Sequence, residues 1–189
     1  ADQLLERIRE ERQARYEQQL EDCKAEVAQW PADGKIRKKP RSPPAPKGEK
    51  PVTHTETSDL SNLPENWTWT RVGELLRVQP HNGRSVKDRE HGFPVLRLNA
   101  IRGGRVDLAQ FKNGAWSEQE AKSYVLEYGD FLVMRGNGSK HFVGTGGLVG
   151  DEGFRVAFPD TMIRLRLEVS QIVPEFFAAV WNSHLMRRQ

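Results

Sequence analysis

The first thirty residues contain neither glycine nor proline, and Pro31 is the first residue able to break a helix there. Apolar side chains recur along this segment at Leu4, Leu5, Ile8, Tyr16, Leu20, Cys23, Val27 and Trp30. From Tyr16 onward their spacing is four, three, four and three residues, which is the heptad period of a coiled coil. We therefore expect one helix over residues 2–30, about 40 Å long at 1.5 Å per residue.

The apolar seam of this helix predicts a packing partner. We expect a partner helix to cover the seam residues Leu5, Ile8, Tyr16, Leu20 and Val27. The alternative is an ordinary amphipathic helix that packs on its own domain.

A stretch rich in proline and basic residues separates this helix from the rest of the chain. Residues 35–50 contain seven basic side chains and one acid, whereas residues 51–189 are nearly balanced, with 17 bases and 16 acids. We expect residues 31–62 to be extended or disordered, because this composition cannot bury apolar surface. The segment is a spacer, a loose arm along a phosphate backbone, or both.

Residues 63–189 alternate short apolar runs with polar turns, which predicts a globular domain of mixed α/β (α+β) class. We expect a short helix after two tryptophans, with Trp67 contributing to the core, and a helix opened by the capping box at residues 117–120. A last helix begins at Pro174 and runs to the end of the chain. The expected strands are residues 93–101, 131–134, 146–150 and 161–168.

Composition excludes several classes of protein. No apolar run approaches 18 residues, so we expect no membrane span, and no secretory leader opens the chain. The single cysteine, Cys23, excludes an internal disulfide and favours a reducing compartment such as the cytoplasm. The five histidines are scattered, which argues against a metal site. Because the sequence begins at Ala1 without a methionine, we read it as a fragment.

Motifs for catalysis are incomplete. Residues 136–140 lack the spacing of a phosphate-binding loop, and residues 144–150 miss a dinucleotide motif because Val149 replaces its last glycine. Glu120 and Lys122, with Asp107 upstream, have the form of a metal nuclease site, but Glu120 already serves the capping box. The sequence therefore predicts no catalytic residue, metal or cofactor on this chain.

Side chains that read base edges are concentrated in three polar clusters, within residues 79–89, 97–105 and 135–141. The third cluster follows an apolar strand and is flanked by glycines, which allow close backbone approach. A solvent-exposed hairpin tip is the alternative, in which Asn137 holds its own turn or Arg135 pairs with an acid. The candidate DNA-binding residues are Arg84, Lys87, Arg97, Asn99, Arg102, Arg105, Arg135, Asn137, Ser139, Lys140 and His141.

Several short motifs follow one another in a distinctive order. They are LLERIREER (4–12), LPENW (63–67), GEL (73–75), VLRLNAI (95–101), GDFLV (129–133), RGNGS (135–139) with VG (143–144), and PEFF (174–177) with NS (182–183). Their order and spacing resemble those of type I restriction–modification specificity subunits, over essentially the whole chain.

The resemblance implies that DNA recognition and chemistry are carried out by different subunits. A full specificity subunit would have two target recognition domains, each reading one half of a split DNA site, separated by long antiparallel helices. Those helices would bind two modification subunits, which carry S-adenosylmethionine and methylate adenine, and a restriction subunit would use ATP and Mg²⁺. The specificity subunit itself would be non-catalytic, in a bacterial or archaeal cytoplasm.

On this resemblance, residues 1–30 are the spacer helix, 31–62 a linker and 63–189 the second recognition domain, truncated at its C-terminal end. The alternative is a non-catalytic, coiled-coil module that binds another protein. Double-stranded DNA and the modification and restriction subunits are the partners expected under the first hypothesis.

Overall fold

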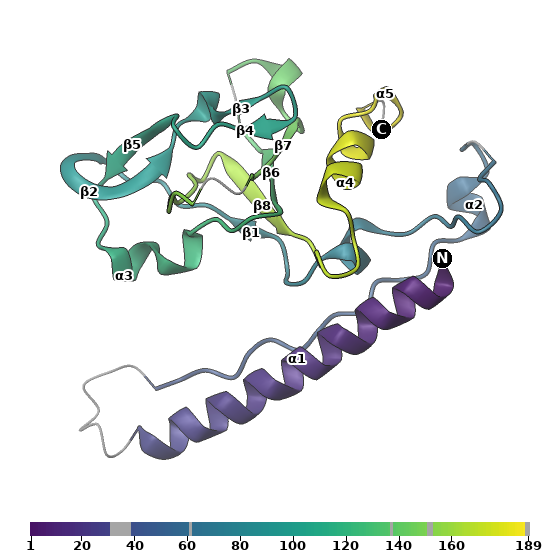
Figure 1. Ribbon diagram of the computed structural model, residues 1–189, viewed down its shortest axis with the longest axis horizontal. Coiled ribbons are helices and arrows are strands. Elements are labelled where there is room, and N and C mark those ends of the chain that lie inside the picture. The colour runs from purple at the N-terminus through teal and green to yellow at the C-terminus, as the bar shows by residue number, and fades with distance from the viewer. Residues whose placement is uncertain (31–38, 61, 137, 151–152, 188–189) are drawn as a thin grey trace. The chain divides into compact units, whose positions relative to one another are not determined.

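The computed structural model describes residues 1–30, 39–60, 62–136, 138–150 and 153–187 (Figure 1). The chain divides into two compact units, Ala1–Leu75 and Leu76–Gln189. A long N-terminal helix is followed by a sheet domain with short helices, so the mixed α/β class is confirmed. The three-part division at residues 30 and 62 stays a prediction. Within the described residues, no helix has the length and apolarity needed to cross a membrane.

The first unit contains the predicted long helix, α1 (Asp2–Gln29). Side chains three or four residues apart pair along its exposed surface, as Lys24 and Glu21 do at 2.6 Å between Nζ and Oε1. The predicted seam is its less exposed side: Ile8 is buried, and Leu5, Tyr16, Leu20 and Val27 are half-buried. A partner helix for this seam stays a prediction.

The linker contains one element that the composition did not predict. Residues 39–53 have no helix or strand, as expected, but α2 (His54–Thr57) forms a short helix. The Thr53 N–H donates to Glu56 Oε2 at 2.9 Å, and this capping box stabilises the helix despite the polar surroundings. The expectation of an irregular linker is therefore wrong at α2, while residues 31–38 and 61 lie outside the described residues.

The second unit is built on a six-stranded sheet in the order β1-β8-β6-β7-β4-β3. The strand labels follow this order from bottom to top in Figure 1. Only the β4–β7 pair is parallel among the ladders of this sheet that the structure describes. A separate two-stranded sheet joins β2 (Asp88–Leu96) to β5 (Phe111–Gly114). The bounds of the other strands are β1 His81–Asn82, β3 Ile101–Arg102, β4 Arg105–Val106, β6 Asp130–Met134, β7 Gly146–Leu148 and β8 Met162–Arg166.

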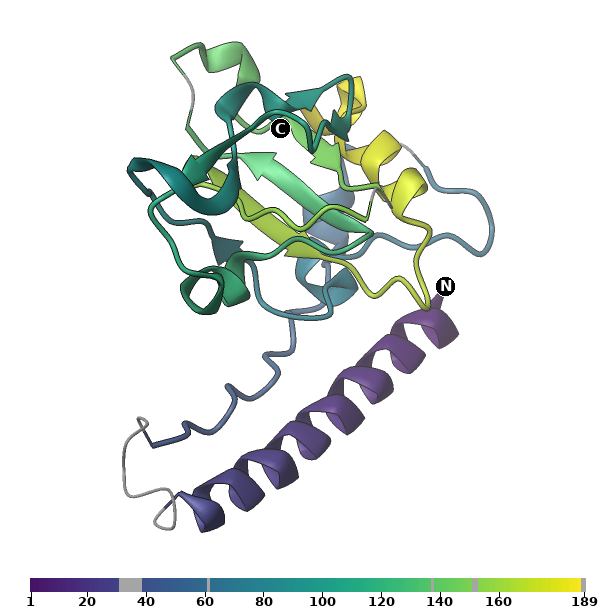
Figure 2. The ribbon, with the colours of Figure 1, turned by 60° about the vertical axis from the view of Figure 1, so that its left-hand side comes forward.

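Strand β6 is buried at every residue and forms the centre of the second unit. Because successive side chains alternate between the faces of a strand, it supports two layers of packing. Leu132 packs in a core cluster with Met162 and Phe158. On the other side, the Phe131 ring lies edge-on to Phe177 of α4 (Pro174–Trp181), with centroids 5.2 Å apart, and Figure 2 shows α4 beside the sheet.

Local signals predicted some of the short helices correctly. The capping box opens α3 (Glu118–Ala121), and Pro174 is the first residue of α4. The expected helix after the tryptophans is a single 3₁₀ turn, η1 (Val72–Leu75), and α3 continues into a second such turn, η3 (Lys122–Tyr124). Trp67 is 57% exposed, so the expectation that it anchors the core is wrong.

Two expected elements are interrupted. The strand expected over residues 93–101 ends at Leu96, because the chain then enters a 3₁₀ turn, η2 (Leu98–Ala100), in which the Ala100 N–H donates to the Arg97 carbonyl at 3.1 Å. The last helix ends at Trp181, where the Asn182 side chain binds the sheet, and α5 (His184–Arg187) follows it.

Candidate nucleic-acid interface

The strand register places the start of the third predicted cluster at one end of the six-stranded sheet. Met134, the last residue of β6, pairs with Met162, the first residue of β8, and Val133 pairs with Gly146, the first residue of β7. The Arg135 N–H then donates to the Thr161 carbonyl at 2.8 Å. We call this the basic end of the sheet: the end where β6 finishes and β7 and β8 begin.

Arg84 of the first cluster leaves the sheet at the same end. Asn82 of β1 pairs with Ile163, and the next N–H, from Gly83, donates to the Met162 carbonyl at 3.1 Å. The Arg84 guanidinium carbon lies 5.8 Å from the centroid of the Trp116 ring, a cation–π contact that holds the charged group against this ring.

Trp116 belongs to a row of aromatic rings beneath Arg84. Its ring centroid is 4.9 Å from that of Tyr124, which stacks on His81 at 5.1 Å. Burial of His81, together with the neighbouring positive charges of Arg164 and Arg166, lowers the pKa of the imidazole below its ordinary value. The imidazole of His81 therefore stays uncharged near neutral pH, and the row of rings beneath Arg84 adds no positive charge that would repel it.

The second cluster is divided between two places. Arg102 and Arg105 flank a β3–β4 turn at Gly103 and Gly104, whose positive φ values of 56° and 78° favour glycine. Arg105 pairs with Leu148, the last residue of β7, and the Leu148 N–H donates to the Gly104 carbonyl at 3.0 Å. Because β4 runs parallel to β7, the turn that precedes Arg105 points toward the basic end, although Arg105 itself lies beside the far end of β7.

Three candidates are not placed at the basic end by the register. Arg97 Nε donates to the Phe111 carbonyl at 3.0 Å, and Asn99 Nδ2 donates to Gln110 Oε1 at 3.2 Å. Lys87 accepts a hydrogen bond at its carbonyl from the Ala115 N–H. These contacts hold Lys87, Arg97 and Asn99 beside the two-stranded sheet, although Arg102 Nε also reaches the Asn99 carbonyl.

The third cluster forms the loop between β6 and β7. Arg135, Lys140 and His141 are exposed, Ser139 is half-buried, and Asn137 lies outside the described residues. A 3₁₀ turn, η4 (Lys140–Phe142), forms the tip. The loop closes through two main-chain hydrogen bonds of 2.8 Å, from Gly144 N–H to the Met134 carbonyl and from Met134 N–H to the Thr145 carbonyl.

The end of α4 fixes the returning side of this loop. Trp181 Nε1 donates to the Gly144 carbonyl at 2.9 Å. The Asn182 amide makes two hydrogen bonds to Gly146, accepting from its N–H at 3.1 Å and donating to its carbonyl at 3.0 Å. Sequence reasoning treated these two residues only as part of a helix, since no local pattern relates them to a loop about 40 residues earlier.

Carboxylates gather at the opposite end of the sheet. Asp130, the first residue of β6, is buried and accepts from Arg166 Nε and Nη2, both at 2.7 Å. Arg166 Nη1 also donates to Glu127 Oε1 at 2.8 Å. Arg166 is therefore paired with carboxylates at this end. Among the residues that the structure describes there, the basic end presents the exposed cations Arg84, Arg135 and Lys140 with one exposed carboxylate, Asp160, so positive charge prevails, as an anion-binding surface requires.

The nuclease-like residues have a structural role. Glu120 Oε2 accepts from both the N–H and the hydroxyl of Ser117 at 2.9 Å, and the first of these bonds is the main cause of the lowered pKa of Glu120. Among the described residues, no group of three His, Cys, Asp or Glu side chains is arranged to hold a metal ion.

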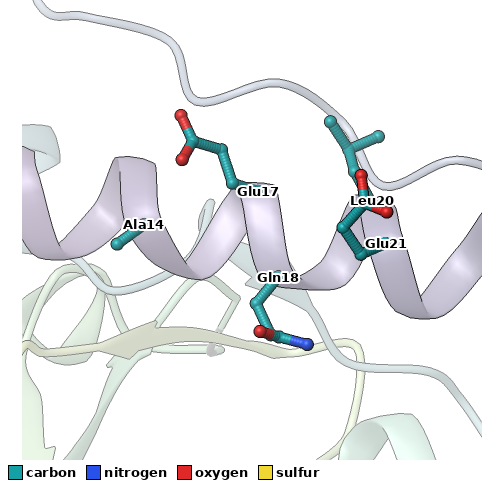
Figure 3. A pocket seen from close by; sticks show the side chains of 5 residues that line it. All are labelled: Ala14, Glu17, Gln18, Leu20 and Glu21. Carbon is teal, nitrogen blue, oxygen red and sulfur yellow. The ribbon is translucent and has the colours of Figure 1, made fainter.

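A hollow along α1 is lined by Ala14, Glu17, Gln18, Leu20 and Glu21 (Figure 3). Gln18 Nε2 is already bonded to Asp22 Oδ1 of the same helix at 2.9 Å. Because the described residues of this lining all belong to α1 and most of their side chains are exposed, we take the hollow as an open surface rather than a cavity for a substrate.

Comparisons with known proteins identify relatives. No protein-family model matches the chain. The EcoKI specificity subunit of Escherichia coli K12 is 34% identical over 113 residues, which cover 58% of this chain and 24% of that protein. The EcoEI specificity subunit of E. coli is 26% identical over 168 residues, or 86% of this chain and 27% of the relative.

The StySPI specificity subunit of Salmonella potsdam is 29% identical over 135 residues, covering 69% of this chain and 29% of the relative. This chain thus spans between 24% and 29% of the length of the curated relatives it matches. All three relatives are named as type I restriction enzyme specificity subunits, so the resemblance inferred from the motifs is confirmed. The chain is therefore related to the type I restriction enzyme specificity subunits.

Proposed function

We propose that this chain is the DNA-reading part of a type I specificity subunit and recognises one half of a bipartite DNA site. One observation carries the proposal: the register of β1, β6, β7 and β8 brings Arg84, Arg135 and the loop that follows it to one end of the sheet. The carboxylates of Asp130 and Glu127 lie at the other end. The relatives support the same role.

In this proposal, exposed cations at the basic end contact DNA phosphates, which fixes the position and register of the protein on the duplex. Polar side chains of the β6–β7 loop then read base edges in the major groove. Arg135 at the start of the loop and Lys140 at its tip are exposed, and the β3–β4 turn adds Arg102 and Arg105. Lys87, Arg97 and Asn99 contact the flanking DNA, and Ser139 and His141 complete the reading loop together with Asn137.

The rest of the proposed complex supplies the chemistry. The seam of α1 packs against a second long helix, and the helices together bind the modification subunits, which carry S-adenosylmethionine. ATP and Mg²⁺ act on the restriction subunit. This chain is a non-catalytic, cytoplasmic component, consistent with the structural role of Glu120.

Mapping of methylated adenines tests the proposal. The full-length gene product is co-expressed with its own modification subunit, and methylated adenines are mapped across the host DNA. We expect one split motif, of which only one half changes when residues 63–189 are replaced by those of a relative. A stable complex that leaves the DNA unmethylated, or a swap that changes neither half, contradicts the proposal.

A second candidate, a module that binds another protein, is favoured by the apolar outer side of α4, where Val173 and Phe176 are 64% and 54% exposed. The two functions differ in their response to salt. Contacts with phosphates weaken steeply between about 50 and 200 mM salt, because bound counterions are released, whereas an apolar protein interface does not.

A further inference from the structure

An aromatic side chain is exposed at the tip of the β6–β7 loop, next to the cations of the third cluster. Phe142 is 53% exposed and Val143 is 41% exposed, and they directly follow the exposed Lys140 and His141. An apolar surface in water gains free energy when another apolar group covers it. None of the phosphate and base contacts proposed above uses this surface.

The backbone holds Phe142 in place on the loop. Its carbonyl accepts from both the N–H and the hydroxyl of Thr145, at 3.0 and 2.6 Å, and its N–H donates to the Ser139 carbonyl at 3.2 Å. Two residues after Phe142, the Gly144 carbonyl accepts a hydrogen bond from Trp181 Nε1, which fixes the backbone there. The ring is thus presented on an ordered backbone, which reduces the entropy lost when it binds a ligand.

The neighbouring charges indicate what covers this ring. Lys140 lies two residues before it, and Arg135 leaves the sheet at the same end, so a surface that Phe142 touches also meets positive charge. DNA combines the two properties: phosphates line the major groove, and the 5-methyl group of thymine is the apolar feature on its base edges. An exposed phenyl ring in a loop that also carries exposed cations matches that combination.

We propose that Phe142 packs on the 5-methyl group of a thymine in the recognised half-site and so contributes to specificity for an A·T pair. This inference rests on the proposed DNA-reading function and names one side chain and one chemical group within it. It adds an apolar contact to a loop whose other candidates all act through charge or hydrogen bonds.

Uracil substitution tests this contact, because uracil pairs like thymine and lacks only the methyl group. The full-length gene product, in complex with its modification subunits, is titrated with duplexes whose mapped half-site contains thymine or uracil. We expect wild-type protein to bind the uracil duplex about fourfold more weakly per thymine contacted, the effect of one methyl group removed from apolar contact. We expect Phe142→Ala to bind both duplexes equally.

Two further variants complete the experiment. Phe142→Leu keeps an apolar side chain and retains part of the preference for thymine. Phe176→Ala removes a ring of matching exposure on α4 and leaves the preference unchanged.

The outcomes separate the two proposals. If wild-type protein binds its site specifically but ignores the uracil substitution, or if Phe142→Ala weakens binding to both duplexes by the same factor, the methyl contact is overturned and the DNA-reading function survives. If wild-type protein does not distinguish its site from unrelated DNA, both proposals fail.

Discussion

The carboxylate of Glu74 accepts a hydrogen bond of 3.0 Å from Nε of Arg9, a residue 65 positions earlier. Its other oxygen accepts from the Glu49 N–H, also at 3.0 Å, and its own carbonyl accepts from Arg12 Nη2 at 2.8 Å. Glu74 is only 5% exposed, so one buried carboxylate joins α1, the linker and η1 within the N-terminal unit. Arg12, which interrupts the apolar seam between Ile8 and Tyr16, is thereby explained.

Glu74→Ala is expected to loosen this junction. Removal of the carboxylate leaves the Glu49 N–H and the Arg9 guanidinium without their acceptor, at a cost of about 1.5–3 kcal/mol. Hydrogen exchange at the Glu49 amide measures the effect locally and should become faster. Glu10→Ala, on the exposed side of α1, is the matched control, and unchanged protection of Glu49 in the Glu74 variant contradicts the assignment.

Asp130→Asn is expected to destabilise the second unit by about 1.5–3 kcal/mol, because it removes the buried charged acceptor of Arg166 and leaves Glu127 as the remaining carboxylate beside the guanidinium. Chemical denaturation measures the free energy of unfolding. The control is Asp88→Asn, which breaks an exposed ion pair with Lys112 and should have little effect. Equal destabilisation by both substitutions would show that burial of the Asp130 pair does not matter.

Asn182→Ala is expected to weaken both the β6–β7 loop and DNA binding, because the loop loses two hydrogen bonds at Gly146. Exchange of the Gly146 amide hydrogen should accelerate, with a stability loss of about 1–3 kcal/mol. Asn182→Asp retains the acceptor for the Gly146 N–H and should have a smaller effect on its exchange. Asn113→Ala removes a comparable amide contact on β5 and should leave DNA binding unchanged.

Lys140→Ala is expected to weaken DNA binding at all sequences without unfolding the domain. Loss of one phosphate contact lowers the slope of log K against log salt concentration by about 0.9. Arg77→Ala provides the control, since the Arg77 N–H pairs with the Arg166 carbonyl at the opposite end of the sheet. An unaltered slope in the Lys140 variant would remove Lys140 from the interface.

The Glu56 carboxyl predicts a pH dependence within the N-terminal unit. The backbone N–H of Thr53, then Arg71 and the Thr53 hydroxyl, lower its pKa from 4.5 to about 2. A carboxyl with a lowered folded-state pKa stabilises α2 fully above pH 4.5, and this contribution is lost as the pH falls through about 2.

Carboxyl-carbon NMR should show a Glu56 midpoint near pH 2. Arg71→Ala should raise this midpoint but keep it below 4.5, because the Thr53 hydrogen bonds remain. A midpoint at the ordinary value in wild-type protein would show that the capping box does not form in solution.

Elements set by local chemistry were predictable from the sequence. The run without helix breakers predicted α1, the apolar run at residues 131–134 predicted β6, and the capping box and Pro174 predicted the starts of α3 and α4. The break after Leu96 was not predictable, because the apolar pattern continues through Leu98 while the backbone already enters the η2 turn. The parallel β4–β7 pair likewise joins residues more than forty positions apart.

The candidate site shows the same limit. Residue type alone identified Arg84, Arg102, Arg105 and Arg135. Only the strand register shows that the turns carrying these residues point toward the basic end of the sheet. Exposure is a tertiary property, so Phe142 was not among the candidate residues and Trp67 was expected in the core.

The β6–β7 loop is closed by main-chain groups of Met134, Gly144 and Thr145. Every residue except proline has the same main-chain N–H and carbonyl, so the hydrogen bonds that close the loop do not depend on which side chains stand at its tip. In the proposed DNA-reading role, point mutations between residues 138 and 143 would therefore change the DNA target without a compensating change in the sheet. Target choice and fold stability could then evolve independently.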